Sequence, residues 1–138
     1  MPYFASGVSF LIRLATTFFC PGIITIKTLA TIIVPSTVPI CMNELLDKSK
    51  LNIEDIDLFV FHQASQLVLE NLIRAMSLDE NKVFINLKDI GNIVSASIPI
   101  ALKDAETQGR LKNGDTIMLV GFGVGLSWGA TLLTWTEI

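Results

Sequence analysis

Short apolar runs that alternate with amphipathic segments constrain this chain more than any other feature of its sequence. Residues 56–61 (IDLFVF) have the nearly continuous apolar character expected of a strand that is buried on both faces. Similar runs follow at residues 82–87, 116–122 and 128–135. Because helical patterns separate the first three runs, the sequence predicts an α/β fold with a mixed, mainly parallel sheet and helices on its faces.

Three amphipathic helices are predicted around these strands. The first covers residues 39–49, the second begins after Ser65, whose hydroxyl can cap a helix, and ends near Met76, and the third covers residues 95–108. Turn residues occupy positions 52–54, 89–92 and 113–115. The last two strands are joined by a short glycine-rich segment, so they are expected to form a final antiparallel hairpin in a three-layered unit over residues 44–135.

The first forty residues differ from the rest of the chain. All 13 acidic residues lie from Glu44 onward, and residues 1–43 contain only Arg13 and Lys27 as charged side chains. Charged residues, prolines and a glycine interrupt each apolar run before it reaches the roughly 20 residues of a spanning helix; they are Arg13, Pro21, Gly22, Lys27, Pro35 and Pro39. Residues 23–34 are rich in Ile and Thr and are predicted to form a strand. We therefore expect an apolar segment of undefined structure at residues 1–37 and a domain at residues 38–138. A membrane-associated role for residues 1–40 is a less favoured hypothesis.

Composition excludes several classes of protein. A hydrophobic content of 51% excludes a disordered chain. A pI of about 5.0 without a basic stripe argues against nucleic-acid binding. Cys20 and Cys41 are too few for a disulfide scaffold and lack metal-ligand spacing, which predicts a reducing, cytoplasmic setting. The single histidine, His62, excludes any site that needs two imidazoles from one chain.

Three polar or glycine-rich segments follow predicted strands: residues 62–65 (HQAS), 91–92 (GN) and 121–125 (GFGVG). Ligands of open α/β sheets bind beyond the carboxyl ends of the strands, so these segments are expected to meet at one site. Each also has an ordinary structural explanation, as a strand-end histidine, a turn asparagine and a hairpin that needs positive φ. The last segment does not match the phosphate-binding GxGxxG pattern, because a strand follows it. Asp55 and Asp57 are expected to face solvent.

The same segments carry a family resemblance. DIDLFVFHQAS, GNIVSASIPIAL and GDTIMLVGFGVGLSWGATLL, in this order, resemble the C-terminal half of 3-oxoacyl-acyl-carrier-protein synthase III, a condensing enzyme with a thiolase-like fold. The resemblance covers roughly residues 38–135. It implies a reaction that joins an acyl group from acyl-CoA to malonyl-acyl-carrier protein with loss of carbon dioxide and CoA, initiating fatty acid or related biosynthesis. It also implies a homo-oligomer, with acyl carrier protein and acyl-CoA as partners and no permanently bound cofactor.

The resemblance further implies roles for individual residues. His62 and Asn92 match the family's catalytic histidine and asparagine, two donors that stabilise the enolate left when a malonyl thioester loses carbon dioxide. The backbone N–H of Val124 matches the family's oxyanion donor. The residues expected to face the substrate or the carrier protein are Gln63, Ala64, Ser65 and Phe122.

Several positions depart from the family pattern. Ser65 stands where the family usually has asparagine, and Leu67 stands where it usually has an arginine that faces the carrier protein. Ile93 and Val94 replace the usual threonine and serine, which removes a hydroxyl.

The family's nucleophilic cysteine and the half of the fold that carries it are not recognisable. Cys20 is followed by Pro21 and could begin a helix, but it lacks the family's surrounding motif. Cys41 is expected to be a buried small hydrophobe. The sequence therefore predicts the C-terminal catalytic domain of a truncated or frame-altered chain. The alternative is a non-catalytic remnant or interaction module that pairs with a separate N-terminal half.

Overall fold

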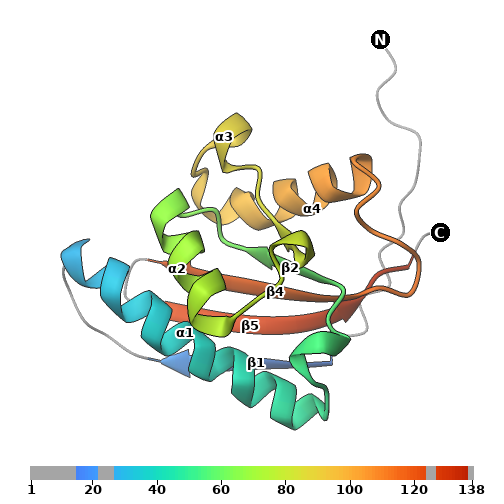
Figure 1. Cartoon of the computed structure of the whole chain (residues 1–138), viewed down its shortest axis with the longest axis horizontal. Helices are drawn as coiled ribbons and strands as arrows, with labels where there is room; N and C mark the ends of the chain where they lie inside the picture. The colour runs from blue at the N-terminus through green and yellow to red at the C-terminus, as the bar shows by residue number, and fades with distance from the viewer. Residues whose placement is uncertain (1–14, 22–26, 124–126, 137–138) are drawn as a thin grey trace.

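The computed structural model describes residues 15–21, 27–123 and 127–136, with side chains from Val34 onward. Within these ranges a five-stranded sheet is combined with helices that cover both of its faces (Figure 1). The helices and strands, in chain order, are β1 (Ala15–Pro21), α1 (Lys27–Ser49), β2 (Leu58–Phe61), α2 (Gln66–Met76), β3 (Val83–Phe84), α3 (Leu87–Ile90), α4 (Ser97–Thr107), β4 (Thr116–Gly123) and β5 (Ser127–Thr134).

The sheet is mixed and mainly parallel, as the sequence predicts. Its strand order is β1-β5-β4-β2-β3. Strand β2 pairs in parallel with β3 and β4, whereas β5 runs antiparallel to both β4 and β1. The carboxyl ends of β2 and β4 therefore lie side by side at one edge of the sheet, with the start of β5 beside them.

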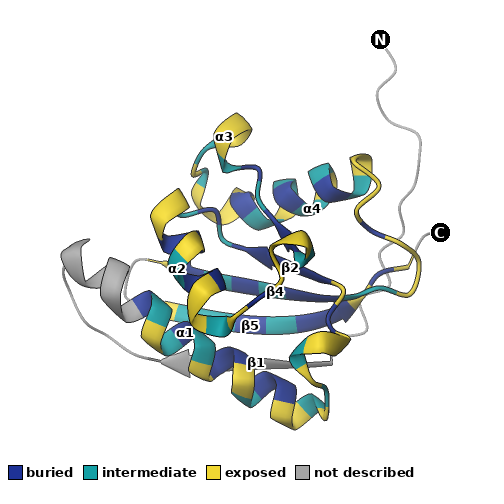
Figure 2. Cartoon of the chain, viewed as in Figure 1, coloured by how far each residue is buried: buried dark blue, intermediate teal, exposed yellow. Residues whose placement is uncertain are grey.

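Each face of the sheet is buried by its own hydrophobic cluster. On one face α1 and α2 pack against Phe59 and Phe61 of β2. On the other face α4 packs against Leu58 and Val60 of the same strand. Because both faces are covered, all four residues of β2 are buried, which explains the continuous apolar run in the sequence. Figure 2 shows the corresponding division in the helices, which bury the stripe that faces the sheet and expose the other side.

The strand predicted for residues 23–34 is wrong over Lys27–Val34, because these residues begin helix α1; residues 23–26 lie outside the described part. From Val34 onward α1 buries positions three or four apart along the helix, and tertiary packing of this face outweighs the weak strand preference of Ile and Thr. The buried residues are Val34, Val38, Cys41, Met42, Leu45 and Leu46. Helix α1 thus runs without a break through residue 37, where the sequence suggested a boundary.

Two smaller differences affect the segment before the candidate site. Strand β3 has only two residues, although residues 82–87 were predicted as a strand. The turn predicted at residues 89–92 is partly helical, because Leu87–Ile90 form the single turn α3. Helix α2 follows the prediction, with the Ser65 hydroxyl accepting a hydrogen bond from the Val68 N–H at 3.4 Å.

Within the described residues, no helix combines the length and apolar character needed to cross a bilayer.

Candidate active site

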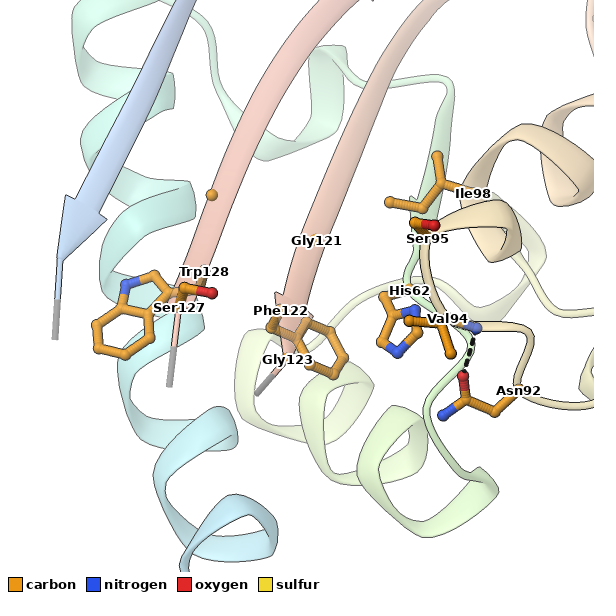
Figure 3. A pocket seen from close by; sticks show the side chains of 11 residues that line it. His62, Asn92, Val94, Ser95, Ile98, Gly121, Phe122, Gly123, Ser127 and Trp128 are labelled. Carbon is orange, nitrogen blue, oxygen red and sulfur yellow. Dashed lines mark hydrogen bonds between the residues drawn. The ribbon is translucent and has the colours of Figure 1, made fainter. Parts of the chain in front are cut away.

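The three segments expected to meet do meet, around an open pocket of about 520 Å³ at the carboxyl ends of β2 and β4 (Figure 3). No charged side chain is found among the described residues that line it. The lining residues are His62, Asn92, Val94, Ser95, Ile98, Gly121, Phe122, Gly123, Ser127, Trp128 and Gly129.

His62 is the first residue after β2, and the sheet fixes its backbone. Its N–H donates to the Val120 carbonyl at 2.8 Å, so the β2–β4 ladder continues to the histidine itself. Its ring meets the Phe122 ring edge to face, with centroids 5.5 Å apart and an interplanar angle of 79°. Burial lowers the pKa of His62 from its ordinary value of 6.5, and a hydrogen bond with the Val94 backbone acts more weakly in the opposite direction. The imidazole is therefore mainly neutral at pH 7.

Asn92 is held by contacts on both sides of its amide. Helix α3 ends at Gly91, whose φ of +74° turns the chain so that Asn92 follows directly. The Asn92 Oδ1 accepts from the Val94 N–H at 3.0 Å, and its Nδ2 donates to the Ala64 carbonyl at 3.2 Å. An amide nitrogen carries two hydrogens, so a second one is available for a ligand in the pocket. The contact with Ala64 ties Asn92 to the segment that follows His62.

Val94 connects the two predicted catalytic side chains, a role that the sequence did not indicate. Its N–H holds Asn92, and its backbone also hydrogen-bonds with His62. Its φ is +57°, a conformation that a β-branched residue adopts only under strain. In Figure 3 Val94 lies between His62 and Asn92. Strain of this kind beside a pocket is typical of a functional segment.

Trp128 is a second pocket residue that the sequence did not indicate. It lies opposite Phe122 in the β4–β5 pairing. Cross-strand neighbours share one face of a sheet, so Phe122 and Trp128 contribute neighbouring aromatic rings. Side chains alternate between the two faces of each hairpin strand, but this alternation predicts the position of Trp128 only when the pairing register of β4 and β5 is known.

The structure places only some of the predicted substrate-facing residues at the pocket. Phe122 lines the pocket beside His62. Gln63 does not face a ligand, since it is 1% exposed and its amide bonds to backbone groups, so that prediction is corrected. Ala64 contributes its carbonyl to Asn92, and Ser65 is an exposed helix cap. Val124 lies outside the described residues.

Cys41 is not among the described residues that line the pocket. Cys20 and Pro21 belong to strand β1, where Cys20 pairs with Trp128, so the hypothesis that Cys20 begins a helix is wrong. Cys41 is buried on α1 with 2% exposure, as predicted.

Asp55 and Asp57 are exposed, as expected, and have structural contacts. The Asp55 carboxylate accepts from the Asn52 N–H at 2.7 Å, and the Asp57 carboxylate accepts from the Thr116 N–H at 2.8 Å. Both contacts organise the ends of elements on the side of the sheet where the strands begin. They give these carboxylates no part in the pocket.

Comparison with known proteins shows that this sequence is similar to one family. The profile described as 3-oxoacyl-[acyl-carrier-protein (ACP)] synthase III C terminal matches residues 46–135. The beta-ketoacyl-[acyl-carrier-protein] synthase III of Clostridium tetani is 43% identical over 94 residues, which are 68% of this chain and 28% of that protein. The chain therefore spans less than a third of the curated relative that it matches.

Solved structures extend the likeness beyond the matched sequence. The 3-oxoacyl-[acyl-carrier-protein] synthase III of Aquifex aeolicus superposes with a TM-score of 0.84 at 27% identity, covering 94% of this chain and 47% of that one. The Thermus thermophilus synthase III gives a TM-score of 0.77 at 35% identity, covering 83% of this chain and 36% of that one. The coverage of 94% is larger than the share of the chain that residues 46–135 represent.

Proposed function

The chain belongs to the 3-oxoacyl-acyl-carrier-protein synthase III family, and from this premise we propose that it supplies the decarboxylating half of a condensing active site. Combined with a nucleophile-bearing N-terminal half, it would join an acyl group from acyl-CoA to malonyl-acyl-carrier protein. Carbon dioxide and CoA are released in that reaction, which initiates fatty acid or related biosynthesis.

The observation that carries the proposal is the shared pocket of His62 and Asn92, joined by the Val94 backbone. When a malonyl thioester loses carbon dioxide, the electron pair left behind delocalises onto the thioester oxygen. Hydrogen-bond donors already aimed at that oxygen stabilise the enolate without reorganisation. A neutral imidazole and a side-chain amide are suitable donors, because neither adds a charge that would bind the malonyl carboxylate and oppose its departure.

The enolate then attacks an acyl group held as a thioester on the nucleophilic cysteine. That covalent intermediate divides acyl transfer into two accessible steps. The thiol attacks the acyl-CoA carbonyl, CoA leaves as the thiol, and the enolate carbon later displaces the cysteine sulfur. We assign the cysteine to a separate half, and the backbone N–H of Val124 to the oxyanion formed during acyl transfer.

The remaining parts of the proposal concern partners and setting. Acyl-CoA and malonyl-acyl-carrier protein act as substrates, and no permanently bound cofactor is needed. Leu67, 57% exposed at the start of α2, replaces the family's carrier-facing arginine, so we expect weak electrostatic attraction of an acidic carrier. A cytoplasmic setting fits a reaction that depends on a reduced thiol.

The decarboxylation step tests the proposal with the chain as it exists. Malonyl-CoA labelled in its free carboxyl group is incubated with the purified chain, and released carbon dioxide is counted. We expect release above the buffer rate. His62→Ala and Asn92→Ala should each reduce it by about 10²–10³-fold, the usual effect of removing one such donor. Gln66→Ala, at an exposed position on α2 outside this pocket, should leave the rate unchanged.

Two outcomes would contradict the proposal. Release no faster than in buffer would favour the non-catalytic module, as would rates that the His62 and Asn92 substitutions leave unchanged. In a parallel incubation, radiolabelled acetyl-CoA should leave no label on the chain, because no described thiol lines the pocket. Label on Cys20 would reject the assignment of the nucleophile to a separate half.

A further inference from the structure

We infer that Gln63 is a positioning residue that fixes the segment carrying His62 against the segment carrying Asn92. The inference rests on the proposed function for its catalytic meaning. Its structural basis is independent of that function and consists of the hydrogen bonds around one buried amide.

The Gln63 side chain is 1% exposed and uses both ends of its amide. Its Nε2 donates to the Phe61 carbonyl at 2.9 Å and to the Phe84 carbonyl at 3.4 Å. Its Oε1 accepts from the Asn86 N–H at 3.3 Å. Phe61 ends β2 and Phe84 ends β3, so one side chain joins the last residues of two neighbouring strands with the start of the next segment.

Asn86 carries this connection toward Asn92. It is 4% exposed, and its carbonyl accepts from the N–H groups of Asp89 and Ile90, which begins the single turn α3. Its Nδ2 donates to the Asp104 carboxylate at 2.7 Å, which anchors the turn to α4. Helix α3 then leads through Gly91 directly to Asn92.

The connection closes on itself. The Asn92 amide donates back to the Ala64 carbonyl, and Ala64 is the residue after Gln63. A closed path thus runs from Gln63 through Asn86 and α3 to Asn92, and returns by Ala64. His62 adjoins this path on one side, so a displacement of either segment changes the position of His62 relative to Asn92.

Glutamine suits this position for a chemical reason. Two carbonyls and one N–H converge on the buried side chain, and an amide offers two donors and an acceptor without a charge. A buried polar group that keeps all its partners specifies one arrangement, whereas a lost partner leaves a costly unpaired group. Misplacement of a catalytic group by about 1 Å can reduce a rate about 10²-fold, so such rigidity is useful at this site.

The main test uses the single histidine of the chain, which makes its imidazole resonance unambiguous in NMR. The pKa of His62 and the side-chain amide shifts of Asn92 are compared between the unsubstituted chain and Gln63→Leu. We expect the pKa of His62 to rise toward 6.5, because a displaced ring is less buried, and the Asn92 shifts to change. Gln66→Leu is the matched control, because Gln66 is exposed and its amide bonds to Glu70 at 2.9 Å. That control should leave both readouts unchanged.

A second measurement does not depend on a variant that folds. In the unsubstituted chain, the Gln63 side-chain amide protons should exchange with water much more slowly than those of the exposed Gln66. Equal exchange would overturn the inference. A folded Gln63→Leu chain with unchanged His62 pKa and unchanged Asn92 shifts would overturn it equally.

The rate of malonyl-CoA decarboxylation separates this inference from the proposed function. Altered His62 and Asn92 signals together with a rate reduced about 10²-fold would support both. Altered signals in a chain that never decarboxylates malonyl-CoA would support the positioning and reject the function. An unchanged rate in a folded Gln63→Leu chain would reject the positioning and leave the function standing.

Discussion

The strained conformation of Val94 makes a quantitative prediction about stability. A residue other than glycine in this region costs of the order of 1–3 kcal/mol. Val94→Asn removes much of this cost, because asparagine adopts left-handed backbone more readily than a β-branched residue. Val94 is 73% exposed, so little apolar burial is lost, about 0.4 kcal/mol from a full value of roughly 1.5 kcal/mol. We expect the free energy of unfolding to rise by about 1 kcal/mol.

Urea unfolding followed by tryptophan fluorescence measures this change, since Trp128 and Trp135 report on β5 and the residue after it. A thermal scan should show an increase in Tm of about 4 °C. Ile93→Asn is the matched control, because it makes a similar chemical change at the preceding residue, where φ is −109°. The control should lower the unfolding free energy. If Val94→Asn also lowers it, or changes nothing, the backbone at Val94 is not strained and the reasoning fails.

Three further predictions concern pH, capping and association. Lowering the pH through 6.5 should reduce the free energy of unfolding, because the unfolded chain binds a proton at His62 while the folded chain, with its lowered pKa, does not. Urea unfolding of His62→Gln at several pH values should lack this decrease. An identical pH dependence in both chains would contradict the lowered pKa of His62. Ser65→Ala should lower the unfolding free energy by about 1 kcal/mol through loss of the α2 cap, measured by the same unfolding experiment, and an unchanged midpoint would show that the cap contributes nothing. Sedimentation at micromolar concentration should give a mass above that of a monomer, because 51% of the residues are hydrophobic and Ile40, Leu67 and Val94 are each more than half exposed; a monomer that unfolds cooperatively would reject association.

Much of the fold followed from local pattern, and the exceptions have a physical cause. The buried run ending at His62, the Ser65 cap and the final hairpin each depend on neighbouring residues, so periodicity and capping chemistry predicted them. The helix predicted for residues 39–49 is confirmed as the second half of α1, whereas the start of α1 at residues 27–34 was predicted as a strand because Ile and Thr prefer a strand locally. The short β3 and the turn α3 also depend on contacts with distant segments.

For the candidate site, the sequence determined which residue types follow each strand, and the tertiary structure decided what those residues do. His62, Asn92 and Gly123 were predicted to meet because ligands of open α/β sheets bind beyond the carboxyl ends of the strands. The burial of Gln63 depends on the approach of Phe84 and Asn86, more than twenty residues later in the chain. The contact of Val94 with both His62 and Asn92 depends on a left-handed backbone that its side chain disfavours. Hydrogen bonds between distant segments and a strained φ produce no periodic pattern in the sequence, so only the tertiary structure shows them.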